Sequence, residues 1–342
     1  NNINLLYMKY KSLNKAKTIF LGLQILRMFF SYSIVYYHGL SKRVCGYKYY
    51  NNVAEVVAVG LTTFFIMAFY FSYDSFMSKN INKIKDRFKR LLIPYILWPV
   101  IMYIEKAIYY YRHGKKIKLF RLLIYQILIG NGLSMILWFN WNLIFVLLFF
   151  AIVIFLNNKY MTYIILIGVH IAFNYYSSYY NKFWGRYNWI IFYPMRPIRN
   201  TYKLGLVGFF LSSIKIINKL KVTKKVLLLF ILALLSLILY INSSIKGHLY
   251  IIFSTFLIVV FAAIPFEKTN IFIFNFIKQI TSHTGGIYYT HGYINDLLNT
   301  YVWSKYLTKK RYTCTKHYFA CYLICFIGTK LFSKTNLKYL FN

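Results

Sequence analysis

Apolar runs of about 20 residues recur along the chain, and they limit its possible folds more than any other feature. A run of this length is what one helix needs to cross the hydrocarbon core of a bilayer. The candidate membrane helices are 18–40, 53–73, 91–111, 135–156, 160–180, 200–217, 226–241, 249–266, 275–298 and 317–333. Two intervening stretches, 112–134 and 181–199, are more polar or are interrupted by Gly and Pro, which favours re-entrant or interfacial segments. The sequence therefore predicts an all-α, polytopic bundle of about ten transmembrane helices.

The composition excludes an ordinary soluble domain. Hydrophobic residues make up 59% of the chain and charged residues only 14%, against roughly 25% charged in an average soluble domain. The 42 Lys and Arg residues outnumber 6 Asp and Glu residues, for a formal net charge of +36. Nucleic-acid-binding chains with such charge do not carry repeated membrane-length apolar runs. We therefore assign the charge to loops and expect a lipid bilayer, and no nucleic acid, as a partner.

We expect residues 1–342 to form a single membrane-embedded domain, because the sequence has no internal repeat, Pro-rich linker or soluble appendage. The run 18–40 is too long and too aromatic for a cleaved signal peptide, so we take it as the first membrane helix. Lys and Arg are almost evenly divided between the two sides of the bundle, but the densest short loop, 79–90, lies on the same side as the basic N-terminal arm. The expected location is a multi-pass protein of the cell membrane with both termini cytoplasmic.

Arg27 and His38 are the first candidate functional residues. They are separated by eleven positions, which returns them to one helix face about 16 Å apart along the axis. A cation near the middle of a membrane helix is costly, so Arg27 is expected to face a partner or a wet cavity. The structural alternatives are an Arg bonded to backbone carbonyls and a His at the membrane interface.

Arg87 and Arg90 form a second candidate pair. They lie three positions apart ahead of an apolar run, so on a helix their side chains are neighbours. Two guanidinium groups suit the capture of phosphate. A cytoplasmic anchor of positive charge has the same spacing, and the sequence does not separate the two interpretations.

Several motifs follow one another along the chain: Arg27 with His38, the pair Phe64-Phe65, Arg87-x-x-Arg90 leading into Pro94, Leu137-Trp138-Phe139, and Gly286-Ile287-Tyr288-Tyr289-Thr290-His291. Together, and in this order, they resemble the acyltransferase family 3 membrane proteins over about residues 18–333. The resemblance implies an integral membrane O-acyltransferase that moves an acyl group, usually acetyl, from cytoplasmic acyl-CoA to a hydroxyl of a cell-surface or exported saccharide.

The resemblance also implies roles for individual residues. His38 would be the acyl-transfer histidine with Arg27 as its partner in the pocket, and Arg87 and Arg90 would hold the CoA. His291 matches the family motif and would line the pocket. His38 can serve either as a general base or as a covalent acyl carrier, and a nearby Arg27 can stabilise the developing oxyanion.

Two positions depart from the family pattern. Gln24 stands where the family commonly has an acidic residue, and Ala68-Phe69 stands where it favours a Ser-Gly pair. The small residue that permits close helix approach is thus missing from that position. These departures keep open an inactive member of the family.

Two further expectations concern ligands. Trp184, in the segment 181–199, offers an aromatic face that can stack on a saccharide. The four cysteines form no CxxC pair and the histidines show no metal-ligand spacing, so we expect no metal.

The rival function is a transporter or flippase for a glycan or lipid-linked substrate, with Arg27 and Glu105 as binding charges, although the paired halves typical of many transporters are not seen.

Overall fold

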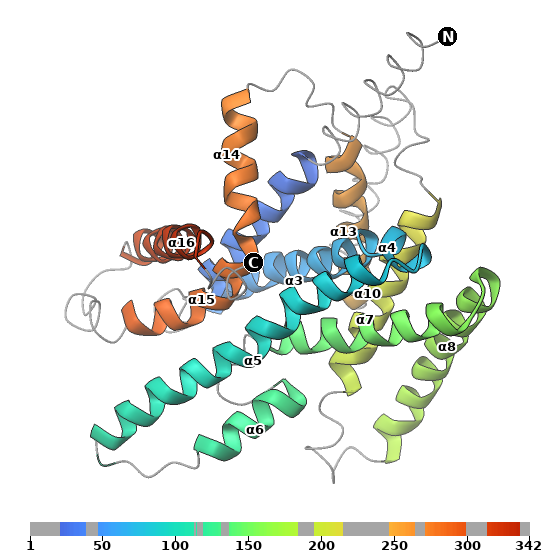
Figure 1. The fold of residues 1–342 in the computed structure, drawn as a ribbon, viewed down its shortest axis with the longest axis horizontal. Helices are drawn as coiled ribbons and strands as arrows, with labels where there is room; N and C mark the ends of the chain where they lie inside the picture. Colours follow the sequence, from blue (N-terminus) through green and yellow to red (C-terminus); the bar gives the residue numbers. More distant parts are fainter. Residues whose placement is uncertain are drawn as a thin grey trace. The chain divides into compact units, whose positions relative to one another are not determined.

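A computed structural model describes residues 21–38, 47–112, 114, 119–130, 137–183, 195–214, 246–263, 271–298 and 313–335. Within these ranges every regular element is a helix and no strand occurs, which confirms the predicted all-α class. Residues 21–38 form the first described helix. The others are α3 (Tyr47–Tyr70), α4 (Tyr73–Met77), α5 (Ile81–Arg112), α6 (Leu119–Ile129), α7 (Trp138–Leu156), α8 (Lys159–Phe183), α10 (Met195–Ile214), α13 (Lys246–Ala263), α14 (Ile271–Ser282), α15 (Thr284–Leu297) and α16 (Thr313–Phe332), shown in Figure 1.

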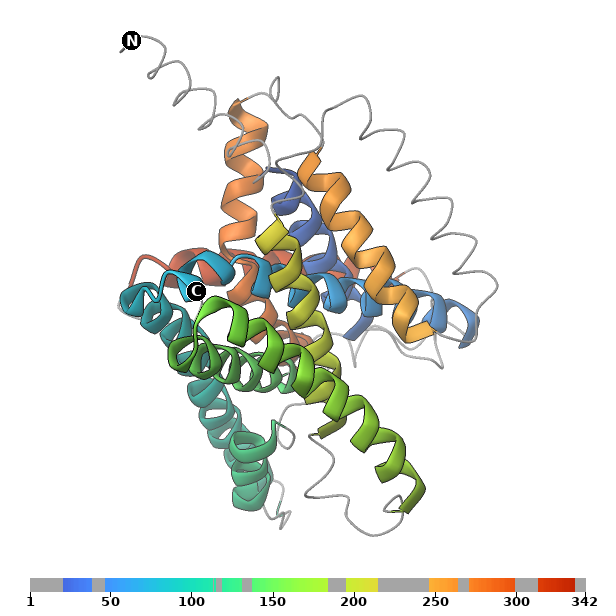
Figure 2. The ribbon, with the colours of Figure 1, turned by 90° about the vertical axis from the view of Figure 1, so that its right-hand side faces the viewer.

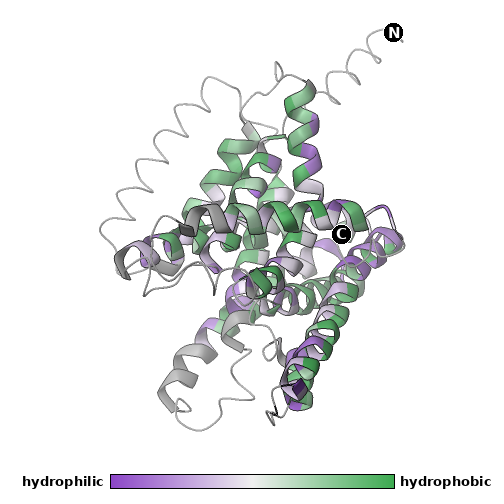
Figure 3. Ribbon diagram, turned by 90° about the vertical axis from the view of Figure 1, so that its left-hand side faces the viewer, coloured by the Kyte–Doolittle hydropathy of each residue, from purple (hydrophilic) through white to green (hydrophobic). Residues whose placement is uncertain are grey.

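Three stretches of the described chain are long and apolar enough to cross a membrane: Tyr49–Met77, Ile81–Arg112 and Trp138–Leu156. Shorter apolar helices occur at Leu119–Leu128, His248–Ala262 and Tyr318–Phe332. Figure 3 shows apolar residues along much of the length of the described helices. The predicted run 226–241 lies outside the described residues, and the total of ten spans stays a prediction.

The predicted single span 275–298 is wrong, because two helices, α14 and α15, meet there at His283. Three hydroxyl side chains close to the break bond to carbonyls of α14. The Thr281 Oγ1 donates to the Ile277 carbonyl at 2.8 Å, Ser282 Oγ to Gln279 at 2.7 Å, and Thr284 Oγ1 to Thr281 at 2.9 Å. Thr62 and Thr63 make the same kind of bond inside α3, where the helix continues, so these bonds accompany the break and do not by themselves cause it. The apolar run is continuous in the sequence, but the backbone forms two helices.

The contacts divide the chain into two compact units. The first contains the described residues up to Phe64 together with α13 to α16, and the second contains Phe65 to Ile214. The boundary falls within α3, so that this helix contributes its first part to one unit and its last turns to the other. The predicted single membrane domain stays a prediction.

In the first unit, two pairs of helices point in the same general direction. The α13 helix contacts α3 through the Tyr250 hydroxyl, which donates to the Glu55 carboxylate, and through Ser254 Oγ, which donates to the Val59 carbonyl at 3.1 Å. Both pairs are 195 positions apart in sequence, so the two helices advance in the same direction. They cross at an angle, as Figure 1 and Figure 2 show. The other pair is the helix 21–38 with α15, described below.

In the second unit, aromatic side chains fill the space between the end of α3, α7 and α10. The Phe69 ring centre lies 5.2 Å from that of Phe150, and Phe150 lies 4.8 Å from Phe209. On α10, a Cβ atom at Gly208 would meet the Ile66 carbonyl oxygen and other atoms of α3 at less than contact distance. Close helix approach here therefore depends on glycine in α10, although Ala68-Phe69 replaces the small pair expected in α3.

Candidate functional site

The helix 21–38 and α15 lie side by side and carry the residues of two sequence motifs that are far apart along the chain. Near one end, the Arg27 Nη2 donates to Thr284 Oγ1 at 2.8 Å. Near the other, Asn295 Nδ2 donates to the His38 carbonyl at 3.4 Å. Both pairs are 257 positions apart, so the helices run parallel and in register.

Arg27 is half-buried, and its partner Thr284 is held by a second hydrogen bond. The Thr284 hydroxyl gives its own hydrogen to the Thr281 carbonyl at 2.9 Å, which leaves an oxygen lone pair for the arginine. The guanidinium thus bonds to the break between α14 and α15. One turn earlier, Gln24 Oε1 is buried and has no hydrogen-bond partner among the described residues.

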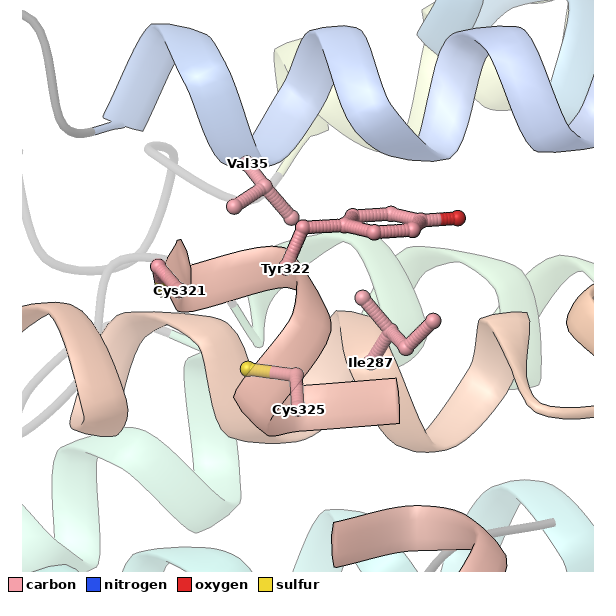
Figure 4. Close-up of a cluster of buried hydrophobic side chains, with 5 residues drawn as sticks. All are labelled: Val35, Ile287, Cys321, Tyr322 and Cys325. Carbon is pink, nitrogen blue, oxygen red and sulfur yellow. The ribbon is translucent and has the colours of Figure 1, made fainter. Parts of the chain in front are cut away.

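A small buried cluster holds these two helices against α16, as Figure 4 shows. Its members are Val35 from the first helix, Ile287 from α15, and Cys321, Tyr322 and Cys325 from α16. Both cysteines are free thiols on one face of the helix. The helix 21–38 is also linked to α16 by the hydroxyls of Ser31 and Tyr322, which lie 2.9 Å apart in a buried hydrogen bond.

His38 and His291 face one another at the end of this packed region. Their ring centres are 5.2 Å apart and their planes are tilted by 43°. The His38 side chain is exposed, whereas His291 is 0% exposed. The ring centres of Tyr37 and His38 are 5.5 Å apart, and the two rings pack in an edge-to-face arrangement. An exposed imidazole backed by a buried one is an arrangement suited to moving protons.

The two candidate phosphate-binding arginines have different environments in the second unit. Arg87 is half-buried, and its Nη2 donates to the Ala68 carbonyl at 2.5 Å, at the last turns of α3. Arg90 is exposed and its Nε donates to the Asp86 carbonyl of its own helix at 3.2 Å. Lys83, Lys85 and Lys89 of α5 are exposed as well. The start of α5 therefore presents several cations to solvent, with Arg87 tied to α3.

Aromatic motif residues also meet in the second unit. The Phe65 ring centre lies 4.1 Å from that of Phe139 and 6.4 Å from that of Trp138. Residues from the Phe-Phe pair of α3 and from the start of α7 thus form one contact. Trp184, the expected saccharide platform, lies outside the described residues.

Sequence reasoning missed Thr284 and Asn295 as partners of the two motif residues in the first helix. Thr284 was recognisable as polar and as the residue before Gly285-Gly286 inside an apolar run. Asn295 occupies the position one turn after His291, on the same helix face. A hydroxyl or amide alone is too common to identify a partner 257 positions away.

Among the residues that the structure describes, no group of three or more His, Cys, Asp or Glu side chains is arranged to hold a metal ion. Compared with protein-family models, with characterised proteins and with solved structures, the chain matches none.

Proposed function

We propose that the protein is an integral membrane acyltransferase that moves an acyl group, acetyl in the simplest case, from cytoplasmic acyl-CoA to a hydroxyl of a cell-surface or exported saccharide. One observation carries the proposal. Arg27 and His38 of the first helix contact the α15 segment that begins at Thr284 and contains the His291 motif. Two motifs from opposite ends of the chain thereby meet along one pair of helices, with one polar contact near each end of the pair.

The directions of the helices support the proposed membrane arrangement. In an alternating series of ten spans, the first runs in the same direction as the ninth, and the second in the same direction as the eighth. The helix 21–38 runs parallel to α15, which is the second half of the predicted ninth run, and α13 points in the same general direction as α3, which agrees with this order. With both termini cytoplasmic, His38 lies toward the outer end of the first helix, on the side of the saccharide.

The proposed reaction needs a group that accepts and returns one proton. The acceptor hydroxyl oxygen bonds to the thioester carbonyl carbon, the carbon–sulfur bond breaks, and the hydroxyl proton passes through His38 to the departing thiolate. Alternatively, a bare ring nitrogen of His38 first bonds to the thioester carbonyl carbon as the carbon–sulfur bond breaks; the hydroxyl oxygen then bonds to that carbon, the carbon–nitrogen bond breaks, and the hydroxyl proton passes to the thiolate. Arg27 lies about 16 Å from His38 along the helix axis, so it adds positive charge to the same pair of helices at long range and does not bond to the oxyanion.

Arg87 and Arg90 are proposed to bind the phosphates of the CoA. Their support is the exposed positive surface at the start of α5, because guanidinium groups bind phosphate well. Arg87 also bonds to the Ala68 carbonyl, so the alternative outcome of the test is that Arg87 has a purely structural role.

The test uses inside-out membrane vesicles supplied with acetyl-CoA labelled in its acetyl group, and measures alkali-labile label on glycan. His38→Ala is expected to abolish transfer at unchanged protein level, and His248→Ala, which changes another exposed histidine, is the matched control. Arg87→Ala/Arg90→Ala is expected to weaken CoA binding. Lys83→Ala/Lys85→Ala removes the same charge from the same helix and serves as its control.

Three results would contradict the proposal. Full transfer by His38→Ala would reject that residue, and equal CoA binding by both double variants would reject specific phosphate capture. A folded wild-type protein that transfers no label from any acyl-CoA would reject the enzyme. Movement of a glycan or lipid-linked substrate across the vesicle membrane would then favour the transporter.

A further inference from the structure

His291 is held in a single tautomer by its own helix. Its Nδ1 lies 2.7 Å from the Tyr288 carbonyl oxygen and 3.2 Å from that of Ile287. A carbonyl oxygen only accepts hydrogen bonds, so the ring hydrogen must be on Nδ1. In the neutral imidazole, Nε2 then has no hydrogen and is an acceptor.

That acceptor nitrogen is buried and has no hydrogen-bond partner within the described ranges. The whole residue is 0% exposed, so the missing bond is not replaced by bulk water. Leaving a buried acceptor unpaired is unfavourable, and such groups are uncommon outside functional sites. The other contacts of His291 are the ring of Tyr288 at 5.9 Å and the Cys321 thiol, which donates to the His291 carbonyl at 3.7 Å. Neither contact engages Nε2.

The facing ring of His38 has the complementary group within reach. The two ring centres are 5.2 Å apart. Each imidazole nitrogen lies about 1.1 Å from its ring centre, so two nitrogens turned toward one another at this separation are about 3 Å apart, a hydrogen-bond distance. The orientation of His291 is fixed by its Nδ1 bonds, and no side-chain hydrogen bond among the described residues holds the His38 ring in another direction.

We propose that His291 is a positioning residue for His38, whose ring N–H it receives on its bare Nε2. This inference rests on the proposed acyl transfer and adds a second histidine with a defined role. The bond would determine which His38 nitrogen carries the hydrogen, and leave the other nitrogen bare for the reacting groups. The same logic applies to the carboxylate that orients the histidine of a catalytic triad.

The role of His291 is the same on both routes of transfer. On the direct route, the acceptor oxygen bonds to the acyl carbon and the carbon–sulfur bond breaks. The hydroxyl proton moves to the bare His38 nitrogen and then to the thiolate, while the hydrogen on the other nitrogen stays bonded to His291. On the covalent route, the bare His38 nitrogen bonds to the acyl carbon and thiolate leaves, and the positive ring keeps its N–H directed at His291.

A first measurement needs no enzymatic activity. Protein labelled with ¹⁵N at histidine is placed in lipid nanodiscs, and the His38 and His291 signals are assigned by their loss in His38→Ala and His291→Asn. We expect the His291 spectrum to show a protonated Nδ1 and a bare Nε2, and His38 to carry one hydrogen-bonded N–H. A His291 with its hydrogen on Nε2 would overturn the inference.

Two substitutions then separate the acceptor from the rest of the side chain. His291→Gln keeps an acceptor near the position of Nε2, whereas His291→Asn keeps an amide donor near Nδ1 and loses that acceptor. We expect His291→Asn to shift the His38 ¹⁵N signals and to lower kcat about 100-fold with KM for acetyl-CoA unchanged, while His291→Gln retains most of kcat. His248→Asn, at an exposed histidine of α13, is the control and should change neither readout.

The outcomes distinguish this inference from the acyltransferase proposal. If His291→Asn leaves the His38 signals and kcat unchanged, the positioning role is overturned. If His291→Gln is as impaired as His291→Asn while the His38 signals stay those of wild type, the role is overturned as well. If wild-type protein transfers no acyl group, the proposed function fails, and the ¹⁵N signals alone decide whether His291 accepts from His38.

Discussion

Gly208 provides the sharpest test of the packing in the second unit. A Cβ atom at this position would lie 2.9 Å from Phe69 Cβ and 3.0 Å from the Tyr70 backbone nitrogen, and closer still to the Ile66 carbonyl oxygen. Two of these three atoms belong to the backbone of α3, which cannot move aside as a flexible side chain can. Gly208→Ala therefore forces α10 away from α3 by about half an ångström or more, since ordinary carbon contacts begin near 3.4 Å.

The magnitude follows from two opposing effects. Overpacking of a filled site costs about 1–3 kcal/mol. Replacement of a helical glycine by alanine returns about 0.5–1 kcal/mol through reduced backbone freedom. The expected net loss is about 0–2.5 kcal/mol of unfolding free energy, which is about 1–3 kcal/mol relative to a glycine-to-alanine change where the new Cβ has free space. Gly205→Ala should cost less, because its new Cβ would meet only ring atoms of Phe69 and Phe150, at 3.0–3.2 Å.

The assay is thermal unfolding of the purified protein in detergent, followed by near-ultraviolet circular dichroism. Trp98, Trp138 and Trp141 lie in the same unit as Gly208 and report on it directly. Gly168→Ala is the matched control, because a Cβ there has no neighbour within 4 Å, and it should leave Tm unchanged or slightly raised. A Gly208→Ala protein as stable as Gly168→Ala would refute the close approach of α10 to α3.

Two further predictions concern hydrogen bonds in the first unit. Thr284→Val removes the acceptor of the Arg27 guanidinium and should lower the unfolding free energy by about 1.5–3 kcal/mol, as expected for a hydrogen bond to a charged group, whereas Thr284→Ser should retain most of the stability. Chemical unfolding in mixed micelles measures both variants, and equal stabilities would argue against the bond. Tyr322→Phe leaves the buried Ser31 hydroxyl without this partner and should cost about 1 kcal/mol, and the double variant with Ser31→Ala should lose less than the sum of the two single changes. Additive losses in that cycle would mean that the two hydroxyls do not interact.

The helical class and the positions of the helices were predictable because both depend on local properties. The length of an apolar run determines whether it can span a bilayer, and three long apolar stretches of the structure, Tyr49–Met77, Ile81–Arg112 and Trp138–Leu156, coincide with predicted runs. The shared face of Arg27 and His38 followed from the helical repeat alone, since residues 21–38 form one helix.

The break at His283 was missed because hydropathy records how apolar a run is and not whether its backbone is continuous. Thr281, Ser282 and Thr284 count only as mildly polar residues in a long apolar run, although their hydroxyls bond to carbonyls of α14 at the point where two helices meet. The sequence showed that the small pair favoured in α3 is replaced by Ala68-Phe69, but not that Gly208 of α10 provides the close approach instead, because packing distance depends on both helices of a pair.

The sequence by itself identified the candidate residues Arg27 and His38, since an arginine and a histidine within an apolar run are recognisable by type and spacing. Only the tertiary structure decided what they meet. Arg27 bonds to Thr284 and His38 faces His291 across more than 250 positions of chain, and no local pattern encodes such a pairing. The bare Nε2 of His291 is likewise a tertiary result, because it requires both the Nδ1 bonds of α15 and the burial provided by neighbouring helices.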